Sequence, residues 1–125
     1  MSAPPPRKRA LYVEDDPQCA NLVKESLAEL CDVDLVRDGF SALDHARQSP
    51  PDVLLVDLRL PTLSGFELVE QWRRDADLEN VPWVVVSAQV MGAERDRAEE
   101  LGCAGFVEKP FSLERLRAAV KAALT

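Results

Sequence analysis

The sequence has no long hydrophobic run, and none of its apolar segments approaches the ~20 residues that a membrane-spanning helix needs. The first ten residues include basic side chains but no apolar stretch after them, so we expect no secretory signal. Cysteine is scarce as well. Three cysteines, an odd number without an export signal, predict reduced thiols in the cytoplasm rather than a disulfide framework. Cys19, Cys31 and Cys103 have no metal-site spacing, and we interpret them as packing residues.

Basic residues are the minority among the charges. The chain has 15 Lys and Arg against 22 Asp and Glu, a net charge of −7. Such an acidic protein repels phosphate backbones, so we expect no direct nucleic-acid binding and favour cations or basic partners. The basic triplet Arg7, Lys8 and Arg9 is the one segment that could bind nucleic acid, but three residues make a small patch for that purpose.

The length of 125 residues suits one domain. A hydrophobic fraction of 46% and a charged fraction of 30% are typical of an ordinary folded protein. We therefore expect a flexible Pro-rich and basic tail over residues 1–8 and one folded domain over residues 9–125.

Short apolar runs alternate with segments of helical periodicity. The uninterrupted runs 53–56 and 83–86 are typical of strands buried on both faces of a parallel sheet. Shorter candidate strands lie at 11–13, 33–36 and 106–107. Five helical segments follow these strands and begin near Pro17, Gly39, Phe66, Glu94 and Leu113. The alternation predicts an α/β fold, with five helices on both faces of a doubly wound five-stranded parallel sheet.

Chemically active residues stand where these strands end. Ligands bind at the carboxyl ends of the strands in such sheets, so side chains there are expected to meet at one edge. The residues at these positions are Glu14, Asp15, Asp16, Asp57, Ser87 and Lys109.

These groups suit phosphoryl transfer. Crowded carboxylates repel one another, and a hard cation such as Mg²⁺, which prefers oxygen ligands, relieves that repulsion. One carboxylate then attacks phosphorus as a nucleophile and forms an acyl phosphate. Lys109 would supply positive charge and Ser87 a hydroxyl donor. The set is chemically complete without histidine. His45, the single histidine, is expected on a helix away from this edge.

Four segments resemble the receiver domain of two-component response regulators. They are LYVEDDP at 11–17, LLVDLRLPTLSG at 54–65, VVVSA at 84–88 and GFVEKPF at 105–111. In this order and at this spacing they are specific, and the resemblance covers about residues 8–124. It implies a flavodoxin-like sheet of strand order 2-1-3-4-5, as in the single-domain chemotaxis regulators.

The resemblance also implies a magnesium site. Glu14 and Asp15 would hold Mg²⁺, with Asp15 the direct ligand and Glu14 acting through water. Asp57 and the backbone carbonyl of Arg59 would complete the protein ligands.

The same resemblance assigns the phosphoryl chemistry. Asp57 would accept a phosphoryl group from the phosphohistidine of a histidine kinase or a histidine phosphotransfer protein. Ser87 and Lys109 would contact the phosphoryl oxygens, and Phe106 matches the switch aromatic. Partners are expected to dock on the face formed by helix 94–101, the strand at 106–107 and the last helix. That face carries Val90, Met91, Arg95, Glu108 and Arg115.

The departures from the family pattern are small. Ser87 stands where threonine is common and keeps the hydroxyl, whereas Phe106 stands where tyrosine is frequent and lacks one. Arg59 and Gln89 occupy variable positions thought to tune phosphorylation and dephosphorylation rates. Arg59 could reach Glu14 in the unphosphorylated protein.

Each residue also has a simpler structural interpretation. Asp57 could cap a strand end, Glu14 and Asp15 could favour a helix dipole, and Ser87 could bond its own turn. Phe106 could be core and Lys109 a surface side chain. For Asp16 the simpler reading is preferred, because Pro17 follows it and Asp commonly caps a helix before proline.

Three rival functions remain open. A magnesium-dependent aspartyl phosphatase usually has a second Asp where Arg59 stands, and a flavin module would need a phosphate loop in place of the acidic one. A receiver-like docking module without phosphorylation is the third. We expect a phosphoacceptor rather than an enzyme, either standing alone or cut from a larger protein.

Overall fold

Five parallel strands form one sheet with the order β2-β1-β3-β4-β5 in the computed structural model, which describes residues 7–60, 62–88 and 92–125. The strands are β1 Arg9–Val13, β2 Asp32–Val36, β3 Val53–Val56, β4 Trp83–Ala88 and β5 Gly105–Lys109. The helices are α1 Pro17–Leu27, α2 Gly39–Gln48, α3 Gly65–Arg74, α4 Gly92–Leu101 and α5 Leu113–Leu124. The expected fold class and strand order are confirmed.

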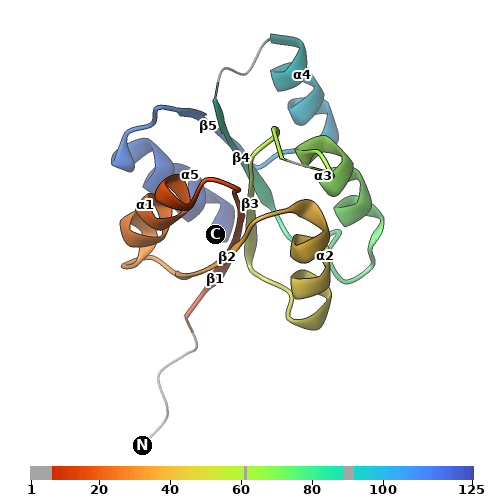
Figure 1. The fold of residues 1–125 in the computed structure, drawn as a ribbon, viewed down its shortest axis with the longest axis horizontal. Coiled ribbons are helices and arrows are strands. Elements are labelled where there is room, and N and C mark those ends of the chain that lie inside the picture. Colours follow the sequence, from red (N-terminus) through yellow and green to blue (C-terminus); the bar gives the residue numbers. More distant parts are fainter. Residues whose placement is uncertain (1–6, 61, 89–91) are drawn as a thin grey trace, which may run out of the picture.

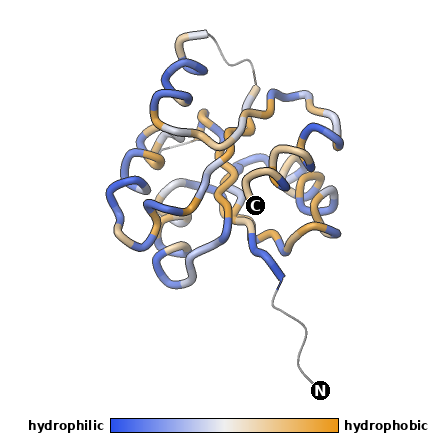
Figure 2. Tube along the Cα trace, turned by 180° about the vertical axis from the view of Figure 1, so that it is seen from behind, coloured by the Kyte–Doolittle hydropathy of each residue, from blue (hydrophilic) through white to orange (hydrophobic). Residues whose placement is uncertain are grey.

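Helices cover both faces of the sheet (Figure 1). α1 and α5 lie on one side, and α2, α3 and α4 lie on the other. Successive strand residues point to opposite faces, so each strand contributes to two separate cores. Leu54 and Val56 face one core, whereas Val53 and Leu55 face the other. Hydrophobic residues accordingly run through the central strands in Figure 2.

Side chains at the helix starts explain where the helices begin. Asp16 accepts a hydrogen bond from the Gln18 N–H at 3.0 Å, which confirms its expected role as the N-cap of α1. Ser64 and Glu67 form a capping box at the start of α3. These caps place each helix immediately after the loop that leaves the carboxyl edge of the sheet.

Helix α4 differs from the others in how it is attached. Ala98 is its one buried residue. Arg97 instead reaches across to α3, where it pairs with Glu70 at 2.8 Å and lies over the Phe66 ring. Helix α4 therefore contacts the rest of the domain through Ala98, the partly buried Leu101 and the charged contacts of Arg97.

Several smaller expectations can be compared with the structure. Trp72 and Trp83 are buried, and the Lys109–Pro110 peptide bond is cis. Arg7, assigned to the tail, pairs with Asp32 at 3.2 Å. Residues 1–6 of that expected tail lie outside the described residues. None of the described helices is both long enough and apolar enough to cross a membrane.

Candidate functional site

The carboxyl ends of four strands bring the expected residues together at one edge of the sheet. Glu14 follows β1 and Asp57 follows β3, and the backbone N–H of Asp57 donates to the Val13 carbonyl at 3.4 Å. Ser87 and Lys109 were expected just after their strands, but they lie within the last residues of β4 and β5. The strand register therefore fixes the backbone positions from which both side chains extend.

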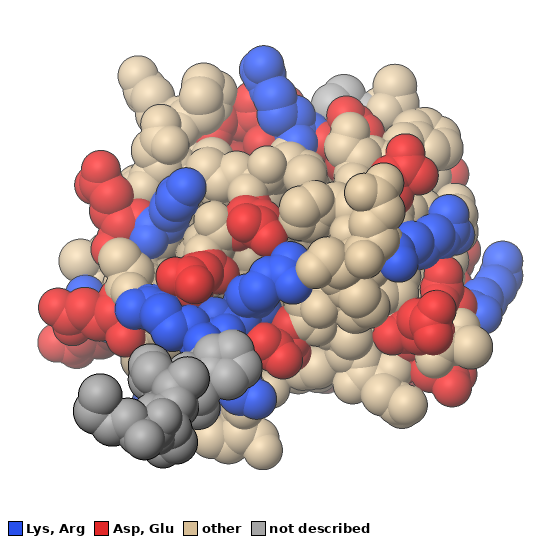
Figure 3. All heavy atoms as spheres, turned by 90° about the horizontal axis from the view of Figure 1, so that it is seen from below, with Lys and Arg blue, Asp and Glu red and all other residues tan. Residues whose placement is uncertain are grey.

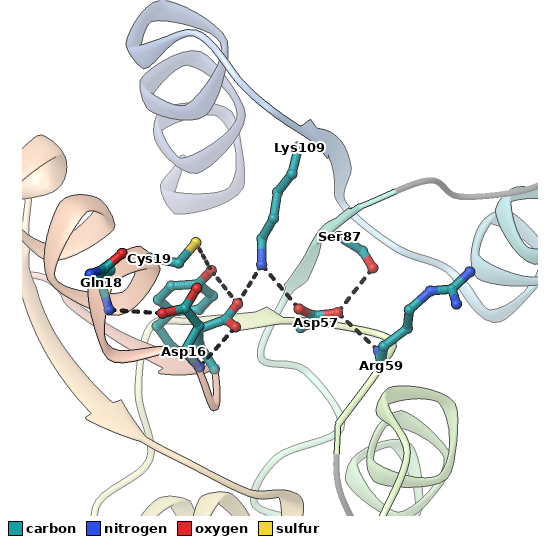
Figure 4. Close-up of polar contacts among 9 residues, drawn as sticks. Asp16, Gln18, Cys19, Asp57, Arg59, Ser87 and Lys109 are labelled. Atoms are coloured by element: carbon teal, nitrogen blue, oxygen red, sulfur yellow. Dashed lines mark hydrogen bonds and ion pairs between the residues drawn. The ribbon is translucent and has the colours of Figure 1, made fainter.

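Lys109 is the central cation of the site. Its ammonium Nζ lies 2.6 Å from Glu14 Oε2 and 3.0 Å from Asp57 Oδ2, and Figure 4 shows it pointing toward the Asp57 carboxylate. Burial alone would lower the pKa of Lys109. The hydrogen bonds and negative charges of Glu14 and Asp57 outweigh that effect and hold this pKa above its ordinary value. Lys109 is therefore a largely buried ammonium held between two carboxylates, and the interpretation as a solvated surface lysine is wrong.

Asp57 is buried and, among the described residues, accepts hydrogen bonds from Ser87, Arg59 and Lys109. The Ser87 hydroxyl donates to Oδ1 at 3.0 Å, and the Arg59 backbone N–H donates to the same oxygen at 2.9 Å. Lys109 donates to Oδ2. Only 6% of Asp57 is exposed, and Ser87 is fully buried. These donors fix the orientation of the carboxylate at the edge of the sheet.

Glu14 is even less exposed, at 3%. Burial raises its pKa, and the Lys109 ammonium opposes that rise. Its Oε2 also accepts a hydrogen bond from the Tyr12 hydroxyl at 2.9 Å, and its Oε1 accepts one from the Asp16 N–H at 3.2 Å. Sequence reasoning missed Tyr12. The available signal was its position two residues before Glu14, because alternate residues of a strand share a face.

The expected metal ligands are only partly assembled. Asp15 is exposed, and no three His, Cys, Asp or Glu side chains among the described residues converge closely enough to hold a metal ion. Mg²⁺ in proteins keeps several waters and uses one or two carboxylates, so a three-carboxylate cage is not required. The donors at this edge are oxygens, which matches the preference of Mg²⁺. The residues therefore fit such an ion.

Arg59 has a different acidic partner from the one expected. Its guanidinium Nη2 lies 3.6 Å from Glu94 Oε1 on α4, and Figure 4 shows the side chain extending away from Asp57. The oxygens of Glu14 are already hydrogen-bonded to Tyr12, Asp16 and Lys109. The expectation that Arg59 reaches Glu14 is not met in this structure.

The face of α4, β5 and α5, on which partners are expected to dock, is called the output face below. It carries both apolar and charged residues. Phe106 is partly buried against the core that α2, α3 and α4 cover, and the Arg95 guanidinium carbon lies 5.1 Å from the centre of its ring. Arg95, Glu108 and Arg115 are exposed. Val90 and Met91, expected on the same face, lie outside the described residues, as does Gln89.

Other singled-out residues lie away from the site. His45 hydrogen-bonds Asp34 through Nε2 at 3.0 Å, next to Arg9 at the β2 edge. The three cysteines form no disulfide, and Cys31 is buried. Figure 3 shows acidic and basic side chains interspersed over one face of the molecule, without a continuous basic surface there.

Comparisons with known proteins agree with one another. The family profile described as the response regulator receiver domain matches residues 10–121. The polar-differentiation response regulator DivK of Brucella ovis is 32% identical over 119 residues, which cover 94% of this chain and 96% of that protein. A sensor protein from Polaromonas sp. JS666 has a TM-score of 0.88 and 32% identity, covering 95% of this chain and 97% of that one. The chemotaxis response regulator CheY4 of Vibrio cholerae, at 24% identity and TM-score 0.86, covers 94% of this chain and 99% of its own, and it shares the fold.

Proposed function

The chain belongs to the response regulator receiver domains of two-component signalling, and from this membership we propose that Asp57 accepts a phosphoryl group from a phosphohistidine. The observation that carries the proposal is the pairing of the buried Asp57 carboxylate with Lys109 and Ser87 at the carboxyl edge of the sheet. A buried carboxylate with a cation and a hydroxyl donor beside it is prepared for charge to develop on an attached phosphoryl group.

The transfer needs no general base. A carboxylate oxygen of Asp57 forms a bond to phosphorus while the phosphorus–nitrogen bond of the phosphohistidine breaks, and the imidazole nitrogen keeps the electron pair. Phosphorylation gives Lys109 and Ser87 new acceptors, because the phosphoryl oxygens then carry the charge that the carboxylate has lost. Both side chains move from Asp57 oxygens toward phosphoryl oxygens.

Bound Mg²⁺ supplies positive charge that neutralises the phosphoryl oxygens during transfer. Asp15 and Asp57 would hold it directly with the Arg59 carbonyl, and Glu14 would act through a bound water. Glu14 is held by three donors in this structure, which suits such an indirect role.

The signal leaves the site through Ser87 and Phe106. When the Ser87 hydroxyl turns toward the phosphoryl group, it vacates space behind β4, and the neighbouring Phe106 ring on β5 rotates inward. Phe106 has no hydroxyl to desolvate, so burial of its ring is less costly than that of a tyrosine. The face of α4, β5 and α5 changes shape, and a downstream protein docks there.

Membership of the family also supports a proposal about the cellular location and the partners of the protein. We place the protein in the cytoplasm, with a histidine kinase or a histidine phosphotransfer protein as donor, and with neither nucleic acid nor membrane as its direct partner. It acts as a phosphoacceptor that dephosphorylates itself, rather than as an enzyme turning over a separate substrate.

The test is the intact mass of the protein after incubation with Mg²⁺ and acetyl phosphate. Wild type should gain one phosphoryl group, and Asp57→Asn should gain none. Asp44→Asn is the matched control, because it makes the same change on an exposed residue of α2. A wild-type mass that stays unchanged, with a donor that phosphorylates another receiver domain, contradicts the proposal.

A further inference from the structure

Tyr12 is an unusual donor at the base of the acidic site. It is the next-to-last residue of β1, is fully buried, and packs among apolar residues such as Val23 and Leu116. Its hydroxyl donates to Glu14 Oε2 at 2.9 Å, and the Cys19 sulfur lies 3.6 Å from the same hydroxyl. Burial raises the pKa of Tyr12 far above its ordinary value, so the hydroxyl keeps its proton. A buried tyrosine hydroxyl usually has a partner, and here that partner is a residue of the functional site.

Tyr12 and Lys109 both donate a hydrogen bond to Glu14 Oε2, but their side chains differ in how freely they can move. Lys109 Nζ bonds Glu14 Oε2 and also Asp57, through a long flexible side chain. In the proposed function Lys109 moves toward the phosphoryl group. The Tyr12 ring cannot move in this way, because it is enclosed by the core between the sheet, α1 and α5, and the other neighbour of its hydroxyl, the Cys19 sulfur, is only a weak acceptor. Tyr12 is therefore the donor that remains on Oε2 when Lys109 turns to the phosphoryl group.

The Glu14 carboxylate needs a fixed hydrogen-bond donor to keep its orientation. A glutamate side chain has one more rotatable bond than an aspartate, and its orientation costs more conformational entropy to fix. The Asp16 N–H holds only Oε1, at 3.2 Å. Without a second fixed donor, the carboxylate would be free to rotate once Lys109 left.

We propose that Tyr12 is a positioning residue, whose hydroxyl orients the Glu14 carboxylate toward the magnesium ion. This inference rests on the proposed function, since it concerns the same metal site. Removing a hydrogen-bond partner of a direct metal ligand commonly changes metal affinity by about 10–100-fold. Glu14 acts through water, one step further from the ion, so the effect of Tyr12 is expected at the lower end of that range. Tyr12 acts through Glu14 and touches neither the ion nor the phosphoryl group.

The test is a double-mutant cycle on Mg²⁺ affinity, measured by amide NMR shifts in titrations with MgCl₂ alone. Tyr12→Phe removes only the hydroxyl and should weaken Mg²⁺ binding about tenfold. Glu14→Asp keeps the carboxylate but shortens it beyond the reach of the Tyr12 hydroxyl. In the Glu14→Asp background, Tyr12→Phe should therefore change the affinity less than about twofold, because coupling exists only between groups in contact.

Cys19→Ala is the matched control. It removes the other polar neighbour of the Tyr12 hydroxyl, leaves the hydrogen bond to Glu14 in place, and should leave Mg²⁺ affinity unchanged. Equal affinity of wild type and Tyr12→Phe overturns the inference, and so does an equal loss in both backgrounds, which would indicate general loosening of the core. If wild type itself binds no Mg²⁺, the metal part of the proposed function fails and the inference falls with it. If wild type binds Mg²⁺ and Tyr12→Phe binds it with the same affinity, only the inference about Tyr12 fails.

Discussion

The guanidinium of Arg59 lies 3.6 Å from the carboxylate of Glu94, so the loop after β3 is joined to the first turn of α4. The backbone N–H of Arg59 also donates to Asp57 Oδ1. One residue thus contacts Asp57 through its backbone and α4 through its side chain.

The first prediction concerns this pair. We expect Arg59→Ala and Glu94→Ala each to change the lifetime of phosphorylated Asp57 several-fold, because the pair ties the loop that contacts Asp57 to α4. Stability should barely change, since an exposed ion pair contributes about 0–1 kcal/mol. Decay of the phosphorylated protein, followed by mass, measures the effect. Glu99→Ala, which removes the partner of Arg95 within α4, is the control. A normal lifetime in Glu94→Ala would show that the pair does not set the rate.

Ser87 is expected to couple the site to the output face. Beryllofluoride, a mimic of the phosphoryl group, should shift wild-type amide resonances in residues 92–108 as well as in the Asp57 loop. In Ser87→Ala, the distant shifts should be lost, because no hydroxyl moves from Asp57 Oδ1 toward the mimic. Phosphorylation of Asp57 should remain largely possible and serves as the control. Distant shifts that persist in Ser87→Ala would rule out this route.

Gly65 is expected to tolerate no side chain. A Cβ at this position would lie 2.5 Å from the Asp57 carbonyl oxygen and 2.6 Å from Leu58 Cα, both of them backbone atoms. Gly65→Ala should therefore displace the loop that carries Asp57 and reduce the free energy of unfolding by about 1–3 kcal/mol in urea titrations. Gly92→Ala is the matched control, because a Cβ there meets no atom within 4 Å. Equal stability of the two variants would contradict the close approach.

Asp38 is expected to make part of the stability depend on pH. It caps α2, accepting bonds from the Ser41 N–H at 2.8 Å and the Ser41 hydroxyl at 3.0 Å. The backbone bond from Ser41 is the main cause that lowers the pKa of Asp38 in the folded protein. The unfolded chain therefore binds this proton more tightly, so the stabilisation is present above the ordinary Asp pKa of about 4 and is lost as pH falls through the lower folded value.

Asp38→Asn isolates that contribution, since asparagine also caps helices well but does not titrate here. The free energy of unfolding of wild type, relative to the variant, should be greater at neutral pH than in acid. Urea titrations of both proteins over the acid range measure it. Parallel pH profiles for the two proteins would exclude the contribution of Asp38.

Much of the fold could be read from local patterns. The apolar runs at 53–56 and 83–86 predicted buried parallel strands, and the helix starts matched the caps found at Asp16 and Ser64. Such features depend on residues a few positions apart, so periodicity and capping chemistry reveal them. Asp57 and Lys109 could be placed at one edge because each stands at the end of its own strand and parallel strands share a carboxyl edge.

The hydrogen-bond and ion-pair partners of individual side chains could not be predicted from the sequence. Lys109 contacts Glu14 across 95 positions of sequence, Arg59 pairs with Glu94 on α4 rather than with Glu14, and the Tyr12 hydroxyl joins the acidic site from within the core. Each of these side chains had several acceptors that were chemically suitable. Sequence pattern and spacing were enough for the sheet, its strand order through the family resemblance, and the residues at its carboxyl edge. The choice among acceptors was decided only when the packed helices and the strand register fixed the distances between groups far apart in the chain.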